Sequence, residues 1–97
     1  MKPVPRVELR RRGAVAHVVL RLARARFDER AAQELCAAAE DLRLDDVTAV
    51  VVVESAGADF GLGFAGLPWG ARLDCVESVA RLPQAVLAVV AGRAWAE

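Results

Sequence analysis

A cluster of glycines in the middle of the sequence could offer backbone N–H groups to a bound molecule. It lies in the segment Ala56-Gly57-Ala58-Asp59-Phe60-Gly61-Leu62-Gly63-Phe64-Ala65-Gly66, directly after an apolar, β-branched run. Glycine lets the backbone approach a ligand closely, and α/β folds keep their ligand sites at the carboxyl ends of strands. A dinucleotide phosphate loop is not predicted, because Leu67-Pro68-Trp69-Gly70 prolongs the loop where a helix would have to begin.

A second glycine turn comes at the end of the sequence. The run from Leu82 to Val90 reads as a buried strand, and it leads into Ala91-Gly92-Arg93-Ala94-Trp95. A strand that ends in such a turn typically delivers N–H groups to a helix start or to a ligand. The sequence stops at Glu97, so we expect residues 1–97 to form a single, incomplete domain that supports a site and lacks part of its chemistry.

The remaining sequence alternates strand and helix patterns. Val7–Arg10 and Ala14–Leu20 read as a hairpin around a turn at residues 11–13, and apolar residues at three- and four-residue spacing after Asp28 predict an amphipathic helix over about 29–43. Val47–Val53 reads as an interior parallel strand, Leu73–Arg81 as a weaker helix, and Val86–Val90 as the last strand. The predicted fold class is α/β, with a mostly parallel sheet and packed helices.

The order and gaps of these segments resemble the enoyl-CoA hydratase/isomerase, or crotonase, superfamily. The resemblance rests on the strand before the glycine loop, on the loop itself, on the last strand with its turn, on Gly13–Leu20, and on the helix that begins Phe27-Asp28-Glu29-Arg30. It therefore covers nearly all of this chain and implies the N-terminal half of a crotonase-like ββα fold.

The resemblance implies an acyl-CoA thioester as substrate or ligand, no covalently bound cofactor and no metal. In this family two backbone N–H groups form an oxyanion hole that polarises the thioester carbonyl. The first donor follows the family's F-x-x-G pattern, matched here by Phe60-Gly61-Leu62-Gly63, so the resemblance assigns it to the N–H of Phe64. The second donor belongs to the turn after Gly92, and its position falls on Glu97, where the family has glycine.

The resemblance also separates two functions. The carboxylates that act as acid and base in many hydratases lie beyond the last residue given, so we expect a hydratase- or isomerase-like enzyme only if further sequence or a partner chain completes it. This chain alone is then inactive. The alternative is a non-catalytic assembly or binding module that kept the fold and lost the active centre.

Several residues are predicted to lie along the acyl-CoA path. By resemblance, Arg24 and Arg26 lie in the stretch of chain that runs beside the adenine and phosphates of CoA, although both also fit ordinary solvated arginines. The loop residues Phe60, Leu62 and Gly63 are assigned to acyl-CoA binding with them. Trp69 either lines an acyl pocket or seals a subunit contact, and the sequence does not separate the two.

Composition restricts the partners. Thirteen Lys and Arg residues against thirteen Asp and Glu residues give no net charge, which does not favour nucleic acid, and no apolar stretch is long enough to span a membrane. We expect a cytoplasmic protein that binds a small acyl-CoA molecule and forms a homo-oligomer or pairs with a complementary chain. Cys36 and Cys75 are expected to be reduced structural thiols, and His17 to be a strand residue without a catalytic role.

Overall fold

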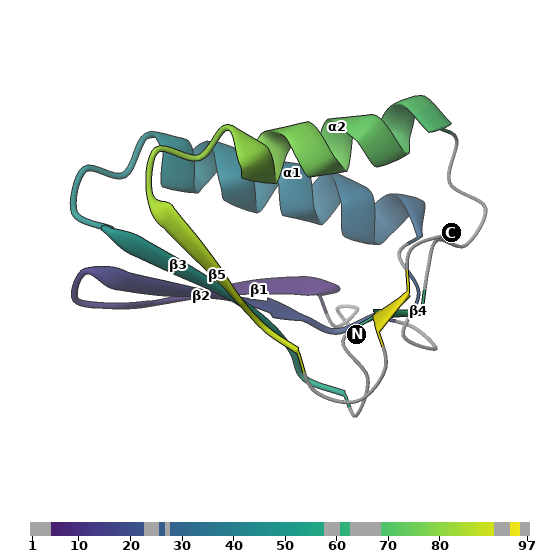
Figure 1. Ribbon diagram of the computed structural model, residues 1–97, viewed down its shortest axis with the longest axis horizontal. Coiled ribbons are helices and arrows are strands. Elements are labelled where there is room, and N and C mark those ends of the chain that lie inside the picture. Colours follow the sequence, from purple (N-terminus) through teal and green to yellow (C-terminus); the bar gives the residue numbers. More distant parts are fainter. Residues whose placement is uncertain are drawn as a thin grey trace.

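The computed structural model describes residues 5–22, 26, 28–57, 61–62, 69–90 and 94–95. Two helices lie over one face of a twisted sheet, and a pair of very short strands lies at one end of it (Figure 1). In chain order the elements are β1 (Val7–Arg12), β2 (Val15–Leu20), α1 (Glu29–Arg43), β3 (Val50–Ser55), β4 (Gly61–Leu62), α2 (Trp69–Ala80), β5 (Ala85–Val89) and β6 (Ala94–Trp95). The predicted α/β class with a mostly parallel sheet is confirmed.

The main sheet has the strand order β1-β2-β3-β5. β1 and β2 form the predicted antiparallel hairpin, but β1 continues to Arg12, two residues beyond the predicted end. The turn is tighter than predicted because Gly13 adopts a φ of 60°, a conformation that glycine enters at no steric cost. β2 pairs with β3, and β3 with β5, in parallel, so β3 is the interior parallel strand that its apolar run indicated.

Helix α1 spans Glu29–Arg43, as the sequence predicted. It begins there because the Asp28 carboxylate accepts a hydrogen bond from the N–H of Ala31 at 2.8 Å, which satisfies one of the unpaired N–H groups of the first turn. Its apolar stripe packs on the sheet, where Leu20, Leu42 and Val51 are fully buried. The hydrophobic core therefore lies between α1 and the strands β2 and β3.

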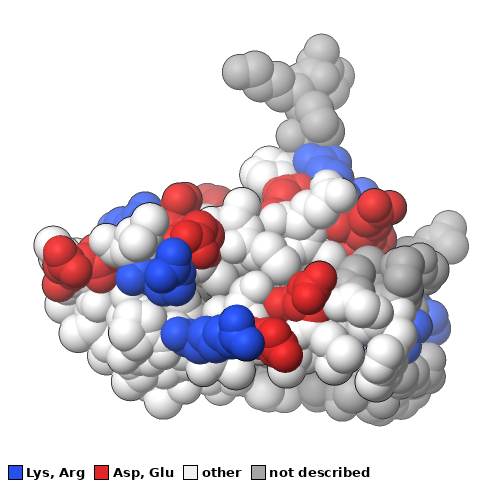
Figure 2. Space-filling model, turned by 90° about the horizontal axis from the view of Figure 1, so that it is seen from above, with Lys and Arg blue, Asp and Glu red and all other residues white. Residues whose placement is uncertain are grey.

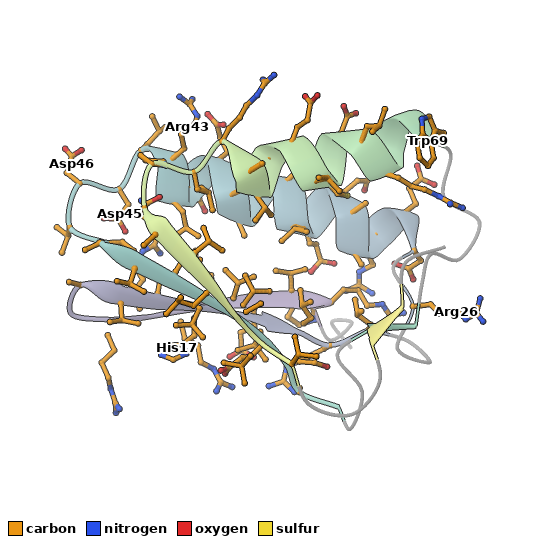
Figure 3. The ribbon with its side chains drawn as sticks, viewed as in Figure 1. His17, Arg26, Arg43, Asp45, Asp46 and Trp69 are labelled. Atoms are coloured by element: carbon orange, nitrogen blue, oxygen red, sulfur yellow. The ribbon has the colours of Figure 1, made fainter. Side chains whose placement is uncertain are left out.

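The predicted start of β3 at Val47 is wrong, because the strand begins at Val50. The cause is Asp45, whose carboxylate accepts hydrogen bonds from the N–H groups of Val47 (2.9 Å) and Thr48 (3.1 Å) and from the hydroxyl of Thr48 (2.6 Å). Those bonds hold residues 45–48 in a turn between α1 and β3, where Figure 3 shows Asp45. Val47 is left 71% exposed.

Helix α2 begins at Trp69, four residues before its predicted start, and ends at Ala80. The prediction placed Trp69 and Gly70 in the loop because glycine disfavours a helix, but one glycine costs only about 1 kcal/mol relative to alanine and does not end a helix by itself. Beyond α2, the side-chain amide of the buried Gln84 donates to the carbonyls of Leu42 and Asp45. That contact, which the sequence did not indicate, joins the start of β5 to the end of α1.

Replacement of Asp28 by alanine should destabilise the chain by about 1 kcal/mol, because α1 loses its N-cap. Asp28→Asn is the matched control, since asparagine caps a helix about as well as aspartate while removing the charge that faces Arg6 at 3.7 Å. Chemical denaturation of the three proteins measures the free energies of unfolding. Equal losses in both variants would contradict a capping role and assign the effect to charge.

Asp45 should make the stability depend on acid pH. The hydroxyl of Thr48, the guanidinium of Arg11 at 2.9 Å and the two N–H groups hold the pKa of its carboxyl well below the usual range. Because the folded-state pKa is lower than the unfolded value of about 3.9, the stabilisation is complete above about pH 5 and is lost as the pH falls toward the folded pKa. Asp45→Asn should be less stable than the natural chain at pH 7, and the difference should shrink toward pH 2.

Urea denaturation of both proteins across this pH range checks the expectation. Asp46→Asn removes the same charge from the adjacent, exposed residue and should leave the acid dependence unchanged. Parallel stability curves for the natural chain and Asp45→Asn would refute the assignment.

Candidate functional site

The candidate site begins where the parallel strands β3 and β5 end. Both strands run in the same direction, with Val50 opposite Ala85 and Glu54 opposite Val89, so the chain leaves both at the same edge of the sheet. After β3, the N–H of Ala56 donates to the carbonyl of Leu20 at 2.9 Å. The chain then turns, because the N–H of Gly57 donates to the Ser55 hydroxyl at 3.2 Å.

Two segments that are far apart in the sequence meet beyond this edge. β4 and β6 form a parallel pair in which Gly61 lies opposite Ala94 and Leu62 opposite Trp95. The pair brings the glycine loop together with the turn after β5 (Figure 1), which are the two segments that the sequence selected for backbone N–H donors. The resemblance implied that the two segments share one oxyanion hole, but it did not predict that they pair as strands.

Most of the predicted site residues lie outside the described residues. These are Arg24, Phe60, Gly63, Phe64 and Glu97. Leu62 lies in β4, two residues before Phe64, and Trp95 lies in β6, two residues before Glu97. The structure therefore describes the strands that lead into both predicted donor positions.

Two further predicted residues lie at the same end of the molecule as β4 and β6 in the view of Figure 3. Arg26 is exposed and precedes α1. Trp69 is the first residue of α2 and is 68% exposed. It starts an apolar stripe that continues at four- and three-residue spacing with Leu73 (44% exposed) and Val76 (60%). In the described part of the chain, Trp69 therefore lies on an exposed apolar face of α2.

A charged hollow of about 410 Å³ lies on the face of the sheet away from the helices, the face on which Figure 3 shows His17. It is lined by Arg10, Arg11, Arg12, His17 and Glu54. His17 lies on a strand, as predicted, and its Nδ1 is 3.5 Å from Oε2 of Glu54. Strand alternation could have indicated this pair, since His17 lies opposite Val52 and Glu54 points to the same face two residues on.

The described residues contain no group of three or more His, Cys, Asp and Glu side chains that could hold a metal ion. Within the same part of the chain, no helix is both long enough and apolar enough to cross a membrane.

Sequence comparisons find no relatives: no family model matches the chain, and no curated protein does. Comparison of the folds finds clear matches among solved structures. An enoyl-CoA hydratase/carnitine racemase from Magnetospirillum magneticum superposes with a TM-score of 0.79 over 93% of this chain, at 22% identity. A monofunctional enoyl-CoA isomerase from M. smegmatis gives a TM-score of 0.77 over 90% of the chain at 28% identity, and an enoyl-CoA hydratase from Mycobacterium marinum gives 0.74 over 91% at 22%.

The match covers only part of each of those proteins. This chain spans 40%, 41% and 37% of the three solved chains, respectively. The share agrees with the predicted resemblance to one half of the family's fold. We conclude that the chain has the α/β fold of enoyl-CoA hydratase/isomerase, or crotonase, structures. The extent of the match is consistent with the prediction that the chain corresponds to the N-terminal half of that fold.

Proposed function

We propose that this chain contributes to an acyl-CoA site of the enoyl-CoA hydratase/isomerase type, in which backbone N–H groups stabilise a thioester enolate. The observation that carries the proposal is the register of β4 and β6. Leu62 lies opposite Trp95, and the proposed donor positions, Phe64 and Glu97, each follow two residues later in the sequence.

The register matters because an oxyanion hole needs N–H donors aimed at one oxygen, and the two donors proposed here belong to segments that are far apart in the sequence. Two parallel strands that lie side by side can each carry one of these donors to the same place. The donors must be fixed before charge develops, and loss of one typically costs about 2.7–4 kcal/mol of transition-state stabilisation. The short ladder between β4 and β6 is suited to fix them.

The exposed Arg26 supports the CoA part of the proposal. A guanidinium at this end of the molecule can pair with the phosphates of CoA, and Arg24 precedes it closely in the sequence. In the proposal, Phe60, Leu62 and Gly63 contact the acyl-pantetheine part. The general acid and base are carboxylates outside residues 1–97, on further sequence or on a partner chain.

The proposal is tested by removing one N–H group. Phe64→Pro deletes the proposed donor, and Phe64→Ala is the matched control that keeps the N–H and removes the ring. If a hydrogen bond to the thioester oxygen contributes about 1 kcal/mol in the ground state, butyryl-CoA should bind Phe64→Pro about fivefold more weakly than Phe64→Ala. Isothermal titration calorimetry measures both affinities.

Free CoA provides the second control, because it lacks the thioester carbonyl and should bind the two variants equally. An equal affinity of the two variants for butyryl-CoA would overturn the donor assignment. An absence of binding to the unaltered chain at millimolar butyryl-CoA would overturn acyl-CoA binding by this chain.

A second function, assembly without catalysis, is favoured by the apolar surface of β5. All five residues of the strand are exposed, with Leu87 at 58% and Val89 at 52%. These two side chains point away from the helices, since their partners in β3 are Val52 and Glu54 rather than the buried Val51. An apolar strand of this kind is typical of a surface that another chain covers.

If assembly is the function, the chain should self-associate through this strand. Leu87→Lys should shift the chain to monomers in sedimentation velocity experiments over the micromolar range, because a charge cannot be buried in the contact without a partner. Val47→Lys makes the same change at a residue that is 71% exposed in the turn before β3, and it should leave association unchanged. A monomeric unaltered chain would contradict homo-oligomer formation.

A further inference from the structure

The two cysteines of the chain meet in the contact between α1 and α2, away from β4 and β6. Cys36 lies on α1 and is partly exposed, whereas Cys75 lies on α2 and is only 4% exposed. Both are free thiols. Cys75 belongs to the buried core cluster, and Cys36 packs against that cluster.

The surrounding contacts place the two cysteines next to each other across the contact between the helices. The hydroxyl of Ser78, one helical turn after Cys75, lies 3.5 Å from Sγ of Cys36, and the same hydroxyl donates to the carbonyl of Asp74 at 2.8 Å. Burial and the adjacent Cys36 thiol, within hydrogen-bonding range, raise the pKa of Cys75 to about 11. The helices thus bring both cysteines into one contact.

A groove makes one of the thiols accessible. It has a volume of about 490 Å³, and Cys36 lines it between the two helices, while Cys75 does not. Oppositely charged pairs border it: Glu40 with Arg43 on α1, and Glu77 of α2 with Arg81, the residue after that helix. The helix-covered face accordingly shows acidic and basic side chains side by side around apolar and uncharged surface (Figure 2).

We propose that Cys36 and Cys75 form a reversible disulfide that links α1 to α2 when the chain meets a hydroperoxide. Cys36, which lines the groove, attacks the peroxide oxygen and becomes a sulfenic acid, and one water is released when hydrogen peroxide is the oxidant. The thiol of Cys75 then attacks the Cys36 sulfur, the S–O bond breaks, and a second water leaves with the thiol proton. Two thiols are oxidised by two electrons, and one peroxide is reduced to two waters.

The location favours a small, neutral oxidant over a charged disulfide. Three carboxylates (Glu40, Asp74 and Glu77) and two guanidinium groups (Arg43 and Arg81) border the groove. Its lining therefore carries a small net negative charge, which disfavours an anionic reagent slightly. Closing the link also joins two helices that are distant in the sequence. The cross-link restricts the unfolded chain, so the oxidised protein should be the more stable form.

Treatment of the 97-residue chain with hydrogen peroxide tests the proposal. The expected product is a monomer lighter by two hydrogen atoms, with a single Cys36–Cys75 cross-linked peptide in the proteolytic digest and a higher melting temperature that dithiothreitol reverses. Cys75→Ser should stop at the sulfenic acid of Cys36, which dimedone labels, and Cys36→Ser should give neither product. Ser78→Ala keeps both thiols and should form the disulfide in the same yield.

Two results would overturn the proposal. One is that both thiols stay free in the folded chain under peroxide while the urea-unfolded chain oxidises. The other is that the disulfide joins two chains, which non-reducing electrophoresis detects. Circular dichroism shows whether each variant is folded. If Cys75→Ser does not fold, Cys36→Ser still provides the test, because position 36 is less buried.

Discussion

The parallel ladder between β3 and β5 is the interaction on which the candidate site depends. Two parallel strands end at the same edge of the sheet. β4 and β6 can pair only because the segments that follow β3 and β5 both begin at that edge. The ladder in turn depends on the core beneath it, where Val51 of β3 packs with α1 and β2. Burial of that core by α1 therefore helps to fix the edge at which β3 and β5 end, and with it the place where β4 and β6 pair.

Local signals in the sequence predicted the elements they control directly. The apolar spacing and the cap at Asp28 predicted α1 to the residue, because both signals lie within the helix itself. The predicted start of β3 was wrong because the carboxylate of Asp45 accepts hydrogen bonds from the N–H groups of Val47 and Thr48. An apolar, β-branched run contains no sign of those bonds. Side chains that compete for backbone groups override strand propensity at such positions.

The two segments of the candidate site were predicted to lie together, whereas the strand pairing that joins them was not. Glycine content and position after a strand identified the loop that contains β4 and the turn that contains β6. The resemblance then assigned one N–H donor to each segment. The register of Leu62 opposite Trp95 could not be predicted, because a two-residue strand is too short to show a period. The same holds for Gln84, whose contacts with the end of α1 join residues that no sequence pattern connects.

The two edges of the described sheet differ in a way that limits how the sheet can grow. At the β1 edge, Arg10, Arg11 and Arg12 are exposed in succession, and three adjacent cations oppose pairing with another strand. At the β5 edge the sequence Ala85-Val86-Leu87-Ala88-Val89 carries no charge. A further strand, from whatever source, is therefore accommodated more readily next to β5 than next to β1.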